Sequence, residues 1–224
     1  MKISSIFDTY FKTTDMAYSD DTHTPKDNNS RFIEDMLDYK QDIINALEDP
    51  FHNQDRLFKN DDRSRNAMIM SAMLDTCHEI IMYCGKMSVF RSNFYNEIDN
   101  TSQGAGERAK EEVKKSLDSF FDNKHKLTII LENFERNYLD DLISERLNDT
   151  SLVTIKRIDK DRLLTSVLSH TALGKKGNEV VIKRRETNTS KYYARCLVNL
   201  NQEMSQDALT LMSYIEEASF PIHR

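Results

Sequence analysis

Residues 70–98 read MSAMLDTCHEIIMYCGKMSVFRSNFYNEI and carry the longest regular apolar pattern in the chain. The pattern occupies nine positions whose spacing alternates between three and four residues, and eight of the nine are apolar: Met70, Met73, Cys77, Ile80, Cys84, Met87, Arg91, Phe94 and Ile98. Such an alternation is typical of a helix with a coiled-coil-like seam. The stretch therefore predicts one helix of about 30 residues.

A second long helix is predicted directly after this one. Residues 100–107 (NTSQGAGE) contain two glycines and break the pattern, which resumes from Glu107 to Leu147. The seam positions of the second helix are Val113, Leu117, Phe120, Lys124, Leu127, Leu131, Phe134 and Tyr138. Two long helices with a short polar loop form an antiparallel helical hairpin. Apolar residues outside both seams, such as Met68 and Ile130, predict that a further helix or a protein partner covers the hairpin.

The residues before the hairpin divide into a short helix, a tether and a second helix. Apolar side chains recur at helical spacing near the start of the chain: Ile3, Ile6, Phe7, Tyr10 and Phe11. A polar stretch follows up to residue 30, and an amphipathic helix over 31–48 ends before Pro50. The first helix either folds back onto the core of the chain or docks into a groove of a partner protein.

The last third of the chain changes its period. Its predicted elements are a strand over Leu152–Ile158, a helix over Asp161–Ala172 closed by Gly174, a β-hairpin of Glu179–Arg185 and Lys191–Leu200, and a helix over Gln202–Glu217. We therefore predict a mainly α fold class in three parts. These are a short amphipathic helix with a polar linker (1–30), a helical assembly domain with a long antiparallel helical hairpin (31–150), and a small basic α+β module with a wing-like hairpin (151–224).

Charge is divided unevenly along the chain. The whole chain has a formal net charge of −6, but residues 151–200 contain 11 basic and 4 acidic side chains, a net charge of +7. Strand alternation places the cations of the predicted hairpin on one face, next to two lysines in the preceding turn. The expected contact residues are Lys175, Lys176, Lys183, Arg185, Lys191, Tyr193 and Arg195. Such a cationic ribbon fits a nucleic-acid backbone, an acidic protein partner or an ordinary solvated surface.

The predicted order of elements has some likeness to winged-helix modules, in which a helix precedes a β-hairpin wing. The likeness covers about a third of the chain and departs from the module in one respect. Between Ile158 and Val180 there is room for one helix and a turn, whereas a helix-turn-helix needs two helices.

No catalytic or metal-binding constellation is evident in the sequence. Cys77 and Cys84 share a helical face, but both occupy seam positions where cysteine acts as a small hydrophobic side chain. Glu179 and Lys183 fall on one strand face without a clear acidic partner, and His170 lies near two serines without the turn that exposes a nucleophile. We therefore predict no catalytic residues, no bound metal and no cofactor.

The sequence favours a non-enzymatic accessory subunit of a multi-protein complex. Its helical region would bind larger subunits and its basic hairpin would contact DNA, RNA or an acidic partner, with no small-molecule substrate. The layout is analogous to small subunits that accompany bacterial SMC-type ATPase and nuclease components in anti-phage defence. A pure protein–protein interaction module (effector, inhibitor or chaperone-like binder) and an enzyme of unrecognised type remain as alternatives. Three cysteines and short apolar runs predict a cytoplasmic protein that does not enter a membrane.

Overall fold

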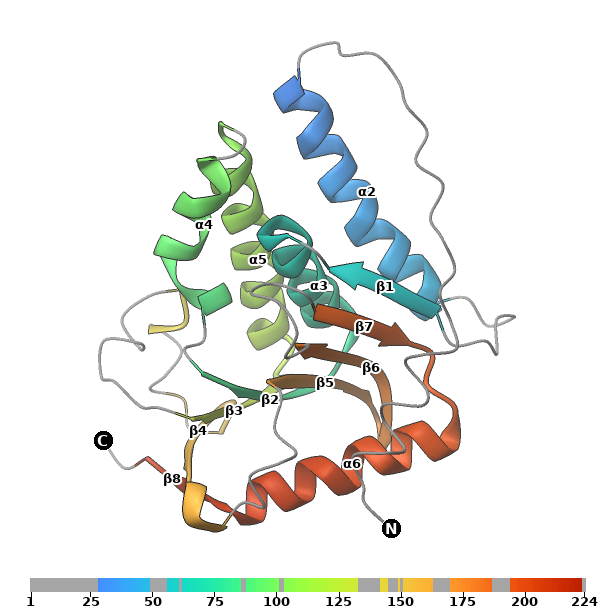
Figure 1. Cartoon of the computed structure of the whole chain (residues 1–224), viewed down its shortest axis with the longest axis vertical. Coiled ribbons are helices and arrows are strands. Elements are labelled where there is room, and N and C mark those ends of the chain that lie inside the picture. The colour runs from blue at the N-terminus through green and yellow to red at the C-terminus, as the bar shows by residue number, and fades with distance from the viewer. Residues whose placement is uncertain are drawn as a thin grey trace.

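A single sheet takes strands from both sides of residue 150. The computed structural model describes residues 28–48, 56–60, 62–85, 88–100, 103–132, 142–144, 149, 151–162, 170–186 and 194–222. Within these residues eight strands form one mixed sheet, with helices on both of its faces (Figure 1). The predicted mainly α class with a long helical hairpin is therefore wrong.

The described helices are α2 (Asn28–Glu48), α3 (Arg63–Thr76), α4 (Ser92–Asp99), α5 (Ala105–Asp122) and α6 (Gln202–Glu217), with 3-10 turns over Ser88–Phe90 and Lys160–Arg162. The strands are β1 (Arg56–Asn60), β2 (Glu79–Cys84), β3 (Lys126–Leu131), β4 (Val153–Ile158), β5 (Thr171–Lys176), β6 (Glu179–Glu186), β7 (Ala194–Val198) and β8 (Ser219–Pro221). Their order in the sheet is β1-β7-β6-β5-β2-β3-β4-β8. The strands β2, β3 and β4 are parallel, and the other neighbouring pairs are antiparallel.

Apolar side chains cover both faces of the sheet. One layer, which includes Met82 and Ala172, belongs to the core that the sheet shares with α2, α3, α4 and α5. The other layer includes Tyr83 and Leu173 and packs against α6. Figure 1 shows α6 on one side of the sheet and α3 and α5 on the other. Because successive side chains of a strand point to opposite faces, the strands β2, β3, β5 and β6 contribute to both layers. We call the two faces of the sheet the α3 face and the α6 face.

The stretch that predicts a helix of 30 residues contains a helix, a strand and a second helix. The helix α3 ends at Thr76, Cys77 has an extended backbone conformation, and β2 begins at Glu79. All four inner residues of β2 are buried. A strand that is buried on both faces is a continuous apolar run, and such a run fits a helical seam as well as it fits a strand. The seam therefore combined three short elements into one.

The second predicted helix fails for the same reason. The helix α5 ends at Asp122, and Lys124 reverses the chain direction with a left-handed backbone (φ 62°). The strand β3 follows directly, and it contains Leu127 and Leu131, two positions of the predicted helical seam. The remainder of the predicted helix, after Glu132, lies mostly outside the described residues. The two long arms of a hairpin are therefore not formed.

The prediction for the last third of the chain was more accurate. The strand β4, the antiparallel pair β6–β7 and the helix α6 occur where the sequence predicts them. The Asn201 side chain accepts a hydrogen bond from the backbone N–H of Met204 (2.9 Å) and caps α6. Residues 171–174 belong to β5, so this end of the predicted helix is wrong, while residues 163–169 lie outside the described residues.

Two predictions concern the first 65 residues. The helix over 31–48 is confirmed as part of α2. The strand β1, for which the sequence analysis makes no prediction, follows this helix and pairs with β7 at one side of the sheet. The expected docking residues Ile3, Ile6, Phe7, Tyr10 and Phe11 lie outside the described residues. Among the described residues, no helix combines the length and the hydropathy that crossing a membrane requires.

Candidate active site

The carboxyl ends of β2 and β3 and the beginning of β5 lie side by side at one end of these inner strands. Thr171 of β5 lies opposite Tyr83 of β2 in an antiparallel pair. The backbone N–H of Glu132 donates a hydrogen bond to the carbonyl of Cys84 (2.9 Å), which places the residue after β3 beside the end of β2. In open α/β sheets, ligands bind outside the carboxyl ends of parallel strands. We call residues 83–85, 131–132 and 170–171 the carboxyl edge.

A histidine and a glutamate face each other at the carboxyl edge. The Nε2 atom of His170 lies 3.3 Å from Oε2 of Glu132. Both side chains are about one-third exposed, at 30% for His170 and 32% for Glu132. A carboxylate beside an imidazole orients the ring and stabilises its protonated form. The pair therefore combines a reactive side chain with access from solvent.

Gly85 leaves the space that the imidazole occupies. A Cβ atom at this position would lie 2.9 Å from Cε1 and 3.2 Å from Nε2 of His170. Either contact is closer than carbon and nitrogen atoms normally approach, so any other residue would push the ring away from Glu132. The glycine that follows β2 is therefore part of the site.

Tyr83 contacts the same imidazole from the α6 face. The ring centroids of Tyr83 and His170 lie 5.7 Å apart with an interplanar angle of 66°, an edge-on contact. Tyr83 is 3% exposed. Burial, and after it the negative charge of Glu132, raise the pKa of Tyr83 to about 12. The tyrosine therefore stays neutral near physiological pH. The effect of Glu132 on its pKa indicates that Tyr83 and Glu132 lie close to one another beside His170.

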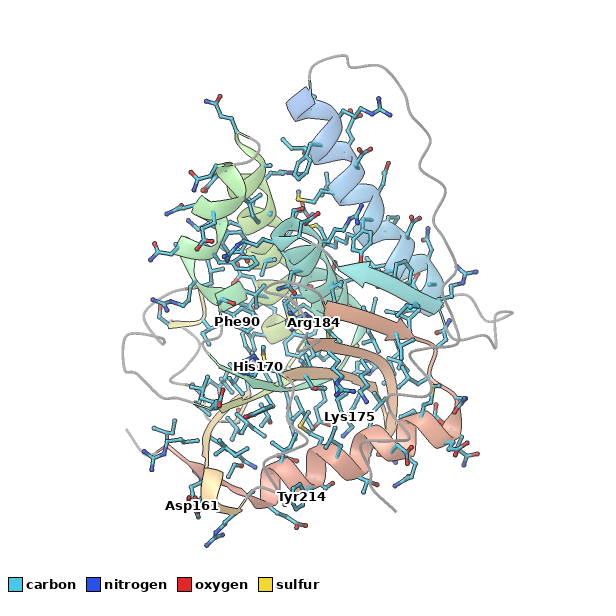
Figure 2. The ribbon with its side chains drawn as sticks, viewed as in Figure 1. Phe90, Asp161, His170, Lys175, Arg184 and Tyr214 are labelled. Atoms are coloured by element: carbon cyan, nitrogen blue, oxygen red, sulfur yellow. The ribbon has the colours of Figure 1, made fainter. Side chains whose placement is uncertain are left out.

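Two of the predicted contact lysines lie at the end of β5 that is remote from His170. Figure 2 shows His170 and Lys175 at opposite ends of this strand. The Nζ atom of Lys175 binds Oε2 of Glu79 at 2.7 Å. Lys176 is the last residue of the same strand and is partly exposed. These two lysines therefore do not belong to the carboxyl edge.

Two other predicted contact residues lie on the α6 face of β6. Lys183 is 4% exposed and Arg185 is partly exposed. Burial, and after it the positive charge of Arg185, lower the pKa of Lys183 to about 8, while Asp207 of α6 acts in the opposite direction. Arg184, between them, belongs to the α3 face and is buried (Figure 2). The cations of β6 are therefore divided between the two faces of the sheet. Of the predicted contact residues in β6, Arg185 is the one that lies opposite Thr171.

The remaining predicted contacts are not described. Lys191 and Tyr193 lie outside the described residues, and only the backbone of Arg195 is placed, in β7 opposite Arg185. Within the described part of the chain, no three His, Cys, Asp or Glu side chains are arranged to hold a metal ion. Burial raises the pKa of Cys77 to about 11, so this thiol stays protonated near neutral pH.

The sequence analysis did not bring His170, Glu132 and Gly85 together. A polar residue or a glycine directly after a short apolar run is the signal that could have identified Gly85 and Glu132, because a buried parallel strand ends there. The apolar runs of β2 and β3 also fit a helical period, and the sequence therefore predicts helices there. No local pattern joins either residue to His170, because the pairing of β2 with β5 is a long-range contact.

No family model and no curated protein sequence matches the chain. Among solved structures it is similar to Nuc, a phospholipase D family member from Salmonella typhimurium, with 10% identity and a TM-score of 0.47 over 76% of this chain and 99% of that chain. It is similar to NucT from Helicobacter pylori, with 10% identity and a TM-score of 0.48 over 75% of this chain and 99% of that chain. TrmBL2, an archaeal chromatin protein described with a novel mode of DNA binding, shows 11% identity and a TM-score of 0.48 over 99% of this chain and 72% of that chain.

Two functional predictions from the sequence are wrong: that the protein is a non-enzymatic accessory subunit and that it is not an enzyme. The first depended on a long helical hairpin as an assembly surface, and the sheet takes the place of that hairpin. The second depended on finding no catalytic group in the sequence, whereas the structure places His170 beside Glu132 at the carboxyl edge. The alternative of a pure protein–protein interaction module and the analogy to subunits of defence assemblies also depended on the predicted helical hairpin.

Proposed function

We propose that this protein is an enzyme that cleaves a phosphodiester of nucleic acid at the carboxyl edge, with His170 as the reacting side chain. The observation that carries this proposal is the contact between His170 and Glu132 at 3.3 Å. An imidazole either takes up a proton from the water that attacks phosphorus, or attacks phosphorus itself and forms a P–N bond that water later hydrolyses. In both cases the P–O bond to the leaving group breaks, the leaving oxygen takes a proton from the imidazolium or from solvent, and the ring is positively charged after the attack. Glu132 stabilises that charge and keeps the ring in one orientation.

The charge of the surrounding segment supports a polyanionic substrate. Residues 151–200 carry a net charge of +7 and contribute β4, β5, β6 and β7, which flank the parallel strands β2 and β3 in the sheet. A segment of this charge attracts the phosphate backbone of nucleic acid and raises its local concentration. The contact residues expected from the sequence remain part of this proposal. Of the described ones, Arg185 lies near His170, and Lys175 and Lys176 lie about 20 Å along the hairpin.

A comparison of two histidine variants tests the proposal. The wild-type protein is assayed with bis(p-nitrophenyl) phosphate, single-stranded DNA, double-stranded DNA and RNA. The variant His170→Asn removes the reacting ring and is expected to lower turnover by about 10²- to 10⁴-fold. The matched control is His78→Asn, an exposed histidine that directly precedes β2 at the other edge of the sheet, and its turnover should equal that of the wild type.

Two results contradict the proposal. One is the absence of turnover by the wild type with all four substrates. The other is equal turnover by the wild type and His170→Asn, which would assign the measured activity to another group or to a contaminating enzyme. Circular dichroism of each variant establishes that the compared proteins are folded.

A further inference from the structure

Arg185 lies one strand away from His170 on the α6 face. It is opposite Thr171, the residue that follows His170, and Thr171 is in turn opposite Tyr83. Arg185, Thr171 and Tyr83 therefore form one row across three neighbouring strands. Tyr83 is also the residue whose ring contacts the imidazole of His170.

The distance across this row is within reach of an arginine. Opposite residues of neighbouring antiparallel strands have Cβ atoms about 5 Å apart. An extended arginine side chain is longer than this separation, and Arg185 is partly exposed at the end of β6 where the carboxyl edge opens to solvent. The guanidinium can therefore extend over Thr171 toward the place where a substrate would meet His170.

A second cation lies close to Arg185 on the same face. Lys183 precedes it by two residues and is buried, and the positive charge of Arg185 is the second cause, after burial, of the lowered pKa of Lys183. Two neighbouring cations repel one another, and a bound anion removes that repulsion. An anionic ligand beside Arg185 would therefore add to the negative charge that Asp207 of α6 already supplies near Lys183.

We infer that Arg185 binds the phosphate group on which His170 acts. This inference rests on the proposed function and adds to it a binding residue and a ligand group, the non-bridging oxygens of a phosphodiester. A planar guanidinium binds two phosphate oxygens through parallel hydrogen bonds, and it keeps its charge at every physiological pH. Arg185 then stabilises the negative charge of the reacting phosphate while Glu132 stabilises the positive charge of the imidazole.

Three arginine variants separate a local phosphate contact from general attraction. Arg185→Met removes the charge, Arg185→Lys keeps the charge without the planar fork, and Arg108→Met is the matched control. Arg108 is an exposed residue in the first turn of α5 and does not belong to the carboxyl edge. For each variant, kcat and KM are measured with bis(p-nitrophenyl) phosphate, and the inhibition constant is measured for inorganic phosphate.

The expected results differ among the three variants. Arg185→Met should lower kcat/KM by about 100-fold and weaken inhibition by phosphate, and Arg185→Lys should fall between it and the wild type. Arg108→Met should leave both quantities nearly unchanged. Equal effects of Arg185→Met and Arg108→Met overturn the inference, because they indicate attraction by net charge alone. An unchanged inhibition constant in Arg185→Lys also overturns it, and this variant decides if Arg185→Met does not fold.

Phosphate binding by calorimetry distinguishes this inference from the proposed function. His170→Asn should bind inorganic phosphate as the wild type does, because Arg185 is intact. If the wild type cleaves no diester but loses phosphate binding in Arg185→Met, the inference stands and the proposed function fails. If the wild type cleaves diesters through His170 and Arg185→Met binds phosphate normally, the proposed function stands and the inference fails.

Discussion

His170 and His125 lie at opposite edges of the same sheet, and their neighbours differ. At the carboxyl edge, His170 faces the carboxylate of Glu132 at 3.3 Å. At the amino ends of β2 and β3, the ring of His125 packs edge-on against His78, with centroids 4.9 Å apart. Burial, and after it the charge of His78, lower the pKa of His125. A carboxylate favours an imidazolium and a second imidazole opposes it, so the first site is suited to proton uptake and the second is not.

Backbone hydrogen bonds connect neighbouring segments at the amino ends of β2 and β3, which we call the amino edge. His78 and His125 directly precede β2 and β3, and these strands start opposite one another at Glu79 and Lys126. The N–H of Lys126 donates to the carbonyl of His78 (3.0 Å), and the N–H of His78 donates to the carbonyl of Lys175 (2.9 Å). These bonds close the connections between helix and strand tightly. At the carboxyl edge, His170 and Glu132 keep about a third of their side-chain surface exposed, so a substrate has access to both groups.

The largest expected effect comes from removing the charge that distinguishes the two edges. Glu132→Gln keeps the shape of the side chain but no longer stabilises an imidazolium, so kcat/KM should fall by about 100-fold. Equal kcat/KM of the wild type and Glu132→Gln would show that the carboxylate does not act on the imidazole.

A smaller effect is expected from displacing the ring without changing a charge. In Gly85→Ala the new Cβ atom would lie 2.9 Å from Cε1 of His170, so the imidazole must move away from Glu132. We expect kcat/KM to fall by about tenfold at an unchanged unfolding temperature, because misplacement of a reacting group slows catalysis steeply. The control is Ser88→Ala, an exposed change three residues later in the chain. Full activity of Gly85→Ala would mean that the position of the ring is not critical.

Lys183 extends the comparison to a base whose pKa is lowered by burial. The pKa of Lys183 is about 8 in the folded protein, against 10.5 for an ordinary lysine. Between these two values the unfolded chain binds more protons, so the contribution of Lys183 to stability rises with pH through this window and is absent below it. Lys183→Met should remove a rise on the order of 2 kcal/mol, measured as the difference in urea unfolding between the two proteins. Parallel curves of stability against pH would place the lysine in solvent.

The accuracy of the sequence prediction depended on whether an element has one buried face or two. The helix α6 alternates between buried residues such as Ala208 and exposed ones, and Asn201 caps it, so its bounds follow from local pattern. The strand β2 is buried on both faces, and its apolar run has no period that separates a strand from a helix. The same ambiguity concealed β3, and the sheet was lost with these two strands.

The candidate site could not be predicted for a related reason. Gly85 and Glu132 are recognisable only once β2 and β3 are known to be strands that end there. His170 joins them through the antiparallel pairing of β5 with β2, which no short-range signal in the chain encodes. Arg185 was selected from the sequence for its charge, but its place beside Thr171 follows from the register of β6 on β5. Residue type was therefore predictable at the site, and spatial neighbourhood was not.

The smallest expected effect concerns the amino edge itself. His125→Asn removes an imidazole whose folded pKa lies below the ordinary value of 6.5. As the pH falls below 6.5, the unfolded chain takes up a proton that the folded chain resists, so the wild type loses stability on acidification. In His125→Asn this loss, measured by urea unfolding below pH 6.5, should be smaller, and turnover near neutral pH should stay at the wild-type level.

The variant His78→Asn decides which cause keeps His125 neutral. If the charge of His78 contributes beside burial, His78→Asn raises the pKa of His125 and part of the acid sensitivity disappears, although His125 is intact. Nuclear magnetic resonance titration of the His125 ring measures this change directly. An unchanged pKa of His125 in His78→Asn would leave burial as the whole cause. His125 and His170 would then differ mainly in burial, because about a third of the side-chain surface of His170 is exposed. The carboxylate beside His170 would be a second difference.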